Sequence, residues 1–440
     1  MMKFKPKVAK HIPIKTPSMH ALDHFDFYYG PLFGKKWPSI RLGLLTPKKF
    51  VAVLNRFSHD IDVNENILQD LGAQDLMQIL RKGFVYVKSM DKGTNNDWDL
   101  EADQISFERN LQNEPDETDD FDEEKSFRTS AGLKEFRRPS EVFEFGQDKT
   151  NMSDSRDIEI TGLEGMGIQL EKVDDFITIP NALKVYTYDR TWLNDYPTPV
   201  KDDNGIYSWW LLDGGSIIPV LALDLKETDS VLDMCAAPGG KSLLILQTGC
   251  FDKLTCNEVK MSRLGQLRRA LANYVPDDDP IVEKVILKRK DAASLEQWDD
   301  IAVYDKVLLD APCTTDKLSV LQDDENLFSS SMTQIRLDLP ATQTKLLINA
   351  LRSVKVGGTV VYSTCSLAPN QNDVVVDNAV SIAESKFGIK VVEKSLALET
   401  KLVSSGLYRF STNCHRGHLI LPFLPSNFGP MYICKLQRIK

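Results

Sequence analysis

Two cysteines stand just after hydrophobic runs that have the length and composition of buried strands. The run 304–310 ends in Asp310 and is followed shortly by Cys313, and the run 358–363 is followed by Cys365. A thiol attacks as its thiolate, and a neighbouring carboxyl group can polarise or protonate a substrate atom. A lone buried cysteine is usually only a small apolar residue. Two thiols and an acid at adjacent strand ends instead predict nucleophilic catalysis.

A third run, 231–235, leads into a glycine-rich turn. The turn reads Cys235-Ala236-Ala237-Pro238-Gly239-Gly240-Lys241, and a turn of this kind before a helix lets a ligand approach the backbone closely. The competing interpretation is a P-loop NTPase, because Gly240-Lys241-Ser242 matches half of that motif. However, the first P-loop glycine would fall at Cys235, and Pro238 has no N–H to offer a phosphate. The turn therefore favours another type of cofactor.

An acid stands at or just after the end of each of the next two apolar runs. Glu258, in the run 253–259, stands about twenty residues past the turn, where an acid can accept hydrogen bonds from the ribose hydroxyls of a nucleoside cofactor. Asp291 follows the run 284–290 and is the corresponding candidate for the adenine. Either acid alone could equally be a solvated surface residue, so their positions relative to the turn carry the prediction.

These runs alternate with helix-like stretches and are completed by runs at 388–393 and 431–438. One helix is predicted to begin near Pro340 and to end at Gly357-Gly358. Alternation of this kind predicts an α/β fold with a parallel sheet covered on both faces, and ligands bind such sheets beyond the carboxyl ends of the strands.

The chain divides by composition into four regions. Residues 1–90 are predicted to be mainly helical, and residues 91–157 form a polar, acidic insertion predicted to be disordered. Residues 158–229 form a segment on the substrate side before the core, and residues 230–440 form the catalytic core. In the first region, Thr46-Pro47 is predicted to start a helix with Phe50, Val53, Leu54 and Phe57 on one face.

The net charge of −10 comes from one segment. Residues 91–125 hold fourteen acids and three bases, so they contribute −11 and the other residues sum to −10 − (−11) = +1. A body that is nearly neutral can still carry basic patches for a nucleic acid. The first 22 residues hold five lysines and no acid, which is compatible with a mitochondrial targeting segment or with a frayed basic terminus.

The seven cysteines are odd in number and form no C-x-x-C pair. This pattern disfavours a disulfide framework and a zinc site, predicts no metal, and indicates a reducing compartment. No apolar run reaches 18 residues, so no membrane span is expected.

The motifs CAAPGGK (235–241), DAPC (310–313) and YSTCS (362–366) together resemble the Sun-domain RNA cytosine-5 methyltransferases, strongly over residues 158–440. Two further stretches, KTPSMHALDHFDFYYGPLFGKKWPSIR near the start and NFGPMYICKLQRI at the end, resemble the mitochondrial ribosomal-RNA member of that family. One departure is visible. The acidic cluster that usually follows YSTCS is replaced by Asn370-Gln371-Asn372-Asp373, which puts in doubt any role for an acid there.

The resemblance implies a class I S-adenosylmethionine-dependent methyltransferase with a Rossmann-like seven-stranded sheet, its last strand antiparallel, and an N-terminal helical extension. The residues alone leave open which thiol attacks, because DNA cytosine methyltransferases use the cysteine of a Pro-Cys pair. The family resembled here implies Cys365 as the nucleophile, Cys313 as the residue for product release and Asp310 as the contact to N3 of the base. The cofactor would contact residues 235–241, Asp310, Glu258, Arg263 and Asp291-Ala292.

The expected reaction is methylation of C5 of an unstacked cytosine in RNA. The resemblance favours mitochondrial small-subunit ribosomal RNA, within an assembling ribosomal subunit in the matrix, and a protein partner of the mitochondrial termination-factor family. A mitochondrial tRNA is the alternative substrate, and a non-catalytic ribosome assembly factor is the alternative of another class.

Overall fold

The computed structural model describes residues 15–82, 170–190 and 195–440, which belong to one unit of the chain. The acidic segment 91–157 lies outside these residues, so the prediction of disorder there stays a prediction. None of the helices in the described part of the chain is long and apolar enough to span a membrane.

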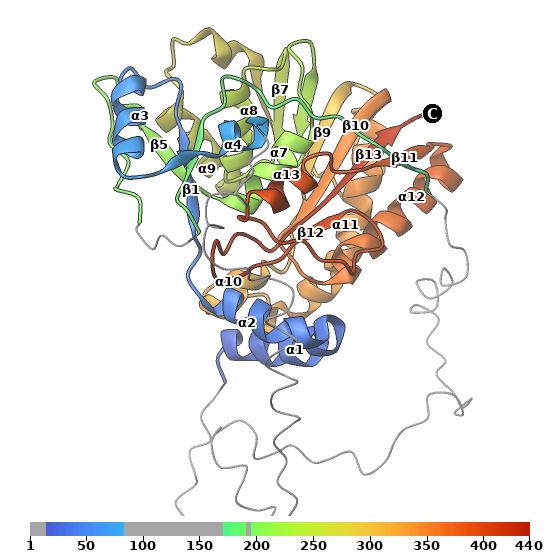
Figure 1. The fold of residues 1–440 in the computed structure, drawn as a ribbon. Helices are drawn as coiled ribbons and strands as arrows, with labels where there is room; N and C mark the ends of the chain where they lie inside the picture. The colour runs from blue at the N-terminus through green and yellow to red at the C-terminus, as the bar shows by residue number, and fades with distance from the viewer. Residues whose placement is uncertain (1–14, 83–169, 191–194) are drawn as a thin grey trace, which may run out of the picture. The chain divides into compact units, whose positions relative to one another are not determined.

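A mixed sheet forms the centre of the fold (Figure 1). Its seven principal strands lie in the order β11-β13-β10-β9-β6-β7-β8. Their bounds are β6 Ser230–Asp233, β7 Lys253–Asn257, β8 Val285–Lys288, β9 Tyr304–Asp310, β10 Val354–Thr364, β11 Val391–Lys394 and β13 Met431–Arg438. Strands β6 to β10 are parallel, and β13 runs antiparallel to its neighbours β10 and β11. The predicted α/β fold with an antiparallel last strand is confirmed.

Two short strands extend the predicted sheet of seven. β3 (Lys172–Val173) pairs with β11, and β12 (His418–Ile420) pairs with β13. Both are too short to show as alternating patterns in the sequence, which is why the prediction omitted them.

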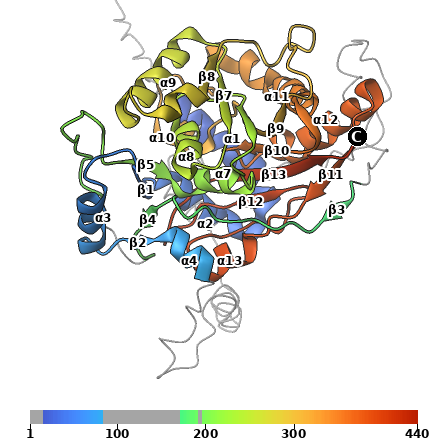
Figure 2. The same ribbon diagram turned by 90° about the horizontal axis from the view of Figure 1, so that it is seen from above.

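Helices cover both faces of the sheet because its strands present apolar side chains alternately to each face. Leu308 of β9 points to a cluster with α7 (Ile218–Ala222), α8 (Gly240–Thr248) and α9 (Met261–Tyr274). Its neighbours Val307 and Leu309 point to a cluster with α11 (Thr333–Ser353) and α12 (Asp373–Phe387). Figure 2 shows the two helical layers on opposite sides of the strands.

The predicted helix near Pro340 is longer at its start than expected and ends earlier. α11 begins at Thr333 and includes Pro340, which removes one helical hydrogen bond but leaves a buried apolar face to hold the helix together. Gly357 and Gly358 lie inside β10, where the pairing with β9 shifts register between Val354 and Thr359. Gly357 has a φ of 87°, so the glycines serve a strand irregularity rather than a helix end.

A second sheet joins the N-terminal region to the segment before the core. Its order is β2 (Gln74–Asp75), β4 (Val185–Thr187), β1 (Phe50–Leu54) and β5 (Trp209–Asp213), and β1 is antiparallel to both of its neighbours. The helix predicted from Thr46-Pro47 is therefore wrong. The run FVAVL is a central strand whose residues 51–54 are all buried, because both faces are covered. A run of apolar residues this short does not distinguish a buried strand from a helix.

Apart from β1 and β2, the described part of the N-terminal region is mainly helical, as predicted. It contains α1 (Pro17–Phe33), α2 (Trp37–Leu45), α3 (Ile61–Asp70) and α4 (Leu76–Lys82). Thr16 caps α1 by accepting a hydrogen bond from the backbone N–H of Met19 at 3.4 Å. Phe25, Tyr29 and Phe33 of α1 are buried in the same apolar cluster as α11 and α12, and α1 contacts α10 (Asp316–Leu321). The helices α1 and α2 are thus packed beside the segment that follows β9, whereas α3 and α4 contact β1 and β4 of the second sheet. A last short helix, α13 (Glu399–Ser404), precedes β12.

Candidate active site

The parallel register of β9 and β10 brings the two cysteine motifs together. Asp310 stands opposite Ser363, whose hydroxyl donates a hydrogen bond to the Asp310 carboxylate at 2.8 Å. The two loops beyond these residues bring the sulfur atoms of Cys313 and Cys365 within 2.9 Å of each other. The backbone N–H of Cys365 also donates to the Cys313 sulfur at 3.3 Å. The predicted pairing of thiols and acid at one sheet edge is thus present.

The two thiols differ in their access to a cavity. Cys365 lines a cavity of about 450 Å³, whereas Cys313 is 7% exposed and does not line it. The hydrogen bond with Cys365, together with burial, raises the pKa of the Cys313 thiol well above its usual value. Cys313 therefore stays protonated beside a thiol that can meet a substrate.

Lys241 supplies a positive charge next to Asp310 in this cavity. It lies in the first turn of α8, and its Nζ donates to the Asp310 carboxylate at 2.7 Å. Burial acts to lower the pKa of Lys241, but Asp310, together with Cys365 and Asp233, more than offsets burial and the pKa is raised. Cys365 also interacts electrostatically with Lys241. Lys241 thus links the acid and the candidate nucleophile.

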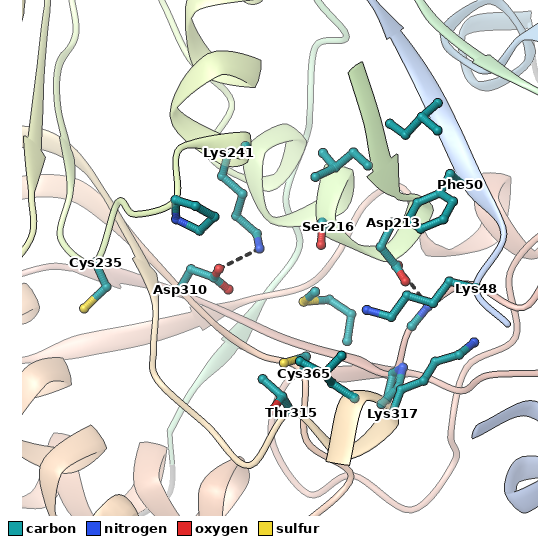
Figure 3. A pocket seen from close by; sticks show the side chains of 18 of the residues that line it. Lys48, Phe50, Asp213, Ser216, Cys235, Lys241, Asp310, Thr315, Lys317 and Cys365 are labelled. Carbon is teal, nitrogen blue, oxygen red and sulfur yellow. Dashed lines mark hydrogen bonds and ion pairs between the residues drawn. The ribbon is translucent and has the colours of Figure 1, made fainter. Parts of the chain in front are cut away.

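Figure 3 shows the cavity from close by, with Lys241 and Asp310 joined, Cys365 and Thr315 below them, and Lys48 and Phe50 on the other side. The glycine-rich turn supplies part of the wall from Asp233 to Lys241. The remaining walls come from elements far apart in the sequence, namely the start of β1, β5, the start of α10 and the segment 429–431. Several separate parts of the chain must therefore fold before the cavity exists.

The turn from Asp233 to Lys241 has the properties of a cofactor cradle. Gly239 has a φ of 119°, and a Cβ there would come within 2.9 Å of the Leu267 side chain. Asp233 is buried, and its Oδ1 has no hydrogen-bond partner among the described residues, so this oxygen is an available acceptor for a ligand donor. Burial also raises the pKa of Asp233 to about 7. A nucleoside cofactor with amino and hydroxyl donors fits this polar, close-packed turn.

None of the predicted ribose and adenine residues is among those that line the cavity. Glu258 is buried, accepts a hydrogen bond from the backbone N–H of Lys260 at 2.9 Å and pairs with Arg263 at 3.4 Å. Arg263 also donates to the carbonyl oxygen of Ala237 at 2.5 Å, which ties Glu258 to the turn. Asp291 is exposed after β8, and Ala292 is buried. Their contacts with a cofactor stay a prediction.

A buried polar network that the sequence did not reveal supports both cysteine loops. Asp316 is fully buried and accepts hydrogen bonds from the Tyr29 hydroxyl at 2.6 Å and from the Leu367 backbone N–H at 2.7 Å. Thr314 and Ser366, beside the two cysteines, donate to the same carboxylate. Asp316 thus joins α1 to the loops after β9 and β10. In the sequence, the only indication of this network was an acid, Asp316, shortly after the motif Asp310-Ala311-Pro312-Cys313.

The amides that replace the usual acidic cluster have a structural role. The Gln371 Oε1 accepts a hydrogen bond from the Thr314 backbone N–H, and its Nε2 donates to the Thr314 hydroxyl, both at 3.1 Å. Asn372 accepts from Thr364 at 2.6 Å and donates to the Ser366 carbonyl oxygen at 2.9 Å. Each amide both donates and accepts, which an ionised carboxylate cannot do. Gln371 and Asn372, which stand in place of the usual acids, therefore connect the two cysteine loops.

Most of the residues that line the cavity outside the turn were not predicted. Among them are Lys48, Phe50, Asp213 and Lys317. Lys317 is 2% exposed, and burial lowers its pKa to about 7 although Asp213 acts in the opposite direction. None of these residues belongs to a recognisable motif, and only pairing of β1 with β5 brings Phe50 and Asp213 together.

The sheet order, the glycine-rich turn after β6 and the thiols after β9 and β10 define a class I S-adenosylmethionine-dependent methyltransferase. The family described as 16S rRNA methyltransferase RsmB/F matches residues 220–436. The chain is 52% identical over 446 residues to the 5-cytosine rRNA methyltransferase nsun-4 of Caenorhabditis elegans, covering 100% of this chain and 96% of that protein.

Two further comparisons agree with the family match. The chain is 35% identical to the 5-cytosine rRNA methyltransferase NSUN4 of Xenopus laevis, over 100% of this chain and 95% of the relative. It is 37% identical to a mitochondrial tRNA (cytosine(34)-C(5))-methyltransferase of Danio rerio, over 55% of this chain and 64% of the relative. The chain belongs to the RsmB/F, or Sun-domain, family of RNA cytosine-5 methyltransferases. This membership decides against the P-loop NTPase.

Proposed function

We propose that this enzyme methylates C5 of a cytosine in small-subunit ribosomal RNA, with Cys365 as the nucleophile. One observation carries the assignment of the thiol: Cys365 lines the cavity, whereas Cys313 is buried behind it with a raised pKa. The ribosomal substrate is supported by relatives named as rRNA methyltransferases that match the whole length of the chain.

The chemistry follows from the weak nucleophilicity of C5. Addition of the Cys365 thiolate to C6 gives the ring enamine character, so that its C5 can attack an electrophile. The S-adenosylmethionine cofactor, when bound, supplies that electrophile as a methyl group on a sulfonium. We assign the contact with N3 to Asp310, which accepts hydrogen bonds from Lys241 and Ser363. In its protonated form Asp310 donates a proton to N3 as negative charge develops there, and it takes the proton back in the last step. Loss of the C5 proton to water and elimination of the Cys365 thiolate then restore the aromatic ring.

Product release is assigned to Cys313. Its sulfur lies 2.9 Å from the Cys365 sulfur, and it remains a thiol because its pKa is raised. An S–H group at this distance can hydrogen-bond the departing Cys365 sulfur and stabilise its developing charge. Cys313 thus acts on the last step rather than on methyl transfer itself.

The substrate is tested with purified protein, labelled cofactor and three RNAs: small-subunit ribosomal RNA, mitochondrial tRNA and an unrelated RNA of equal length. Bisulfite sequencing locates any 5-methylcytosine. Methylation of a single ribosomal cytosine is the expected result. Methylation of the tRNA alone would instead support the alternative raised by the mitochondrial tRNA methyltransferase relative.

We also propose that the enzyme acts in the mitochondrial matrix, on a ribosomal subunit or together with a partner of the mitochondrial termination-factor family. The lysine-rich start supports the mitochondrial location. The near-neutral net charge outside residues 91–125 supports the need for a ribosomal subunit or a partner. Phosphate contacts supply most RNA affinity, so a body with little net positive charge is expected to bind naked RNA weakly. A filter-binding titration at physiological salt, with and without the partner, tests this. Tight, sequence-selective binding by the chain alone would contradict it.

A further inference from the structure

A second hollow adjoins the catalytic cavity. This flanking groove has a volume of about 510 Å³, within the roughly 300–1,000 Å³ of typical small-ligand sites. It is formed by residues 46–50, Thr187 and Tyr188 at the end of β4, Asp195, Tyr196, Leu211 of β5, Leu424 and residues 426–428. Lys48, Phe50 and Leu211 line both the catalytic cavity and the flanking groove. The groove therefore continues directly from the place where the target cytosine must enter.

The flanking groove contains apolar side chains that remain exposed. Phe50 is 41% exposed, Leu211 36% and Leu424 44%, although the four residues after Phe50 in β1 are buried. Single exposed apolar residues are ordinary, but a cluster of them in a hollow indicates a binding site. Phe50 is the aromatic ring shared with the catalytic cavity, so it lies at the boundary between the two hollows.

The walls of the groove are held in place without a ligand. Tyr188 and Tyr196 stack with their ring centroids 4.6 Å apart, and the Tyr196 hydroxyl donates to the carbonyl oxygen of Tyr186 at 2.8 Å. Lys49 donates to the carbonyl oxygens of Arg190 at 3.2 Å and Pro425 at 2.8 Å, which connects opposite walls. A site of this kind costs little ordering when a ligand binds.

The charged residues of the groove determine on which side a phosphate can bind. Lys48 makes no hydrogen bond or ion pair within the described part of the chain, and in Figure 3 its amino group points into the catalytic cavity. Asp195 also lines the groove, and its carboxylate would repel a phosphate. A polyanion that crosses from one hollow to the other is therefore expected to pass on the Lys48 side.

We propose that the flanking groove binds the nucleotide next to the target cytosine, with its base stacked on Phe50 and the phosphate between the two nucleotides held by Lys48. This inference rests on the proposed function, because it requires an RNA substrate. An aromatic ring beside a lysine is the arrangement with which proteins hold unpaired nucleotides, since every base has a face that can stack. The groove thus keeps the RNA strand open beside the extruded cytosine.

The test uses the full chain and a short RNA that contains the cytosine methylated by the wild-type enzyme. Phe50→Ala is expected to raise KM for RNA about tenfold while leaving the Kd of the cofactor unchanged, and Phe50→Trp should restore KM. Lys48→Ala should raise KM and reduce its dependence on salt, and Lys48→Arg should restore both. Phe176→Ala and Lys253→Ala are matched controls, because both residues are exposed and line neither hollow.

A second measurement changes the RNA instead of the protein. RNAs that lack the base of the neighbouring nucleotide, on the 5′ or on the 3′ side of the target cytosine, are compared with the intact RNA. For one of the two, kcat/KM of the wild-type enzyme should fall about tenfold, whereas kcat/KM of Phe50→Ala, which has already lost the stacking, should hardly change. Equal losses in both proteins, or a Phe50→Ala enzyme that behaves like Phe176→Ala, would overturn the proposal. A wild-type protein that makes no 5-methylcytosine in any RNA would refute the proposed function instead, so the two failures are distinguishable.

Discussion

Cys365 and Cys313 lie 2.9 Å apart, yet only Cys365 lines the cavity. The thiol that can contact a base is therefore not the one in the Pro-Cys pair. Under the proposed function, Cys365 forms a bond to the base, and the Cys313 sulfur is close enough to act on that bond. Two predictions separate these roles.

Cys365→Ala should abolish methyl transfer and leave cofactor affinity within a few-fold of the wild type, because we propose that the thiol acts on the base and expect the turn 235–241 to bind the cofactor. Transfer of labelled methyl groups and calorimetric titration of the cofactor measure the two effects. Expression of this variant in cells that lack the enzyme also tests the non-catalytic alternative. If it restores ribosome assembly in full, the protein acts there as an assembly factor.

Cys313→Ala should form the covalent bond to RNA and fail to release it. A slowly migrating protein–RNA band should accumulate on a denaturing gel after incubation with RNA and cofactor. Cys313→Ala/Cys365→Ala is the matched control, and its lane should lack the band. Persistence of the band in the double variant would show that the two roles are wrongly assigned.

The sequence predicted the site residues that follow strands of the main sheet. It did not predict the site residues that come from other parts of the fold. Asp310, Cys313 and Cys365 follow recognisable runs, so the geometry of a parallel sheet already predicts their proximity. Phe50 and Asp316 could not be found in this way. Phe50 reaches the cavity only through the pairing of β1 with β5, and Asp316 becomes important only because α1 buries it.

Among the elements, α1 has the clearest influence on the site. Tyr29 donates a hydrogen bond to Asp316, and the backbone N–H of Leu367 and the hydroxyl of Ser366 donate to the same carboxylate. Burial raises the pKa of Asp316, so these donors stabilise a carboxylate that burial disfavours. The position of an N-terminal helix is thereby coupled to both catalytic loops.

Tyr29→Phe should lower the free energy of unfolding by about 1.5–3 kcal/mol, because it removes a hydrogen bond to a buried acid. Denaturant titration measures this loss. Tyr28→Phe is the matched control, since Tyr28 is 38% exposed and its hydroxyl can bond to water. Equal stability of the two variants would contradict the coupling.

The elements of the core were easier to predict than those before it. The runs 304–310 and 431–438 coincide with β9 and β13, because both are long and buried. The five residues of β1 were instead assigned to a helix, since so short an apolar run fits either period. The shared sheet of β1 and β5 could not be predicted either, because more than a hundred residues separate the strands.

At the scale of the whole molecule, the long segment between β2 and β4 is open to a direct test. Deletion of residues 95–150 should leave soluble protein with unchanged cofactor affinity, because that stretch has too little apolar content to join a core. Calorimetric titration and circular dichroism provide the measurements. Insoluble protein, or loss of cofactor binding, would show that the segment belongs to the fold.

The sheet shared by β1 and β5 also has a consequence for biosynthesis. Phe50 pairs with Asp213, so β1 must wait for 213 − 50 = 163 further residues before β5, the later of its two partners, leaves the ribosome. At about 5–20 residues per second, this interval is roughly 8–33 seconds. The helix α1 waits still longer for α10. During that time, the apolar residues of both elements lack part of their native contacts. The nascent chain is therefore expected to need chaperone protection most at its N-terminal end.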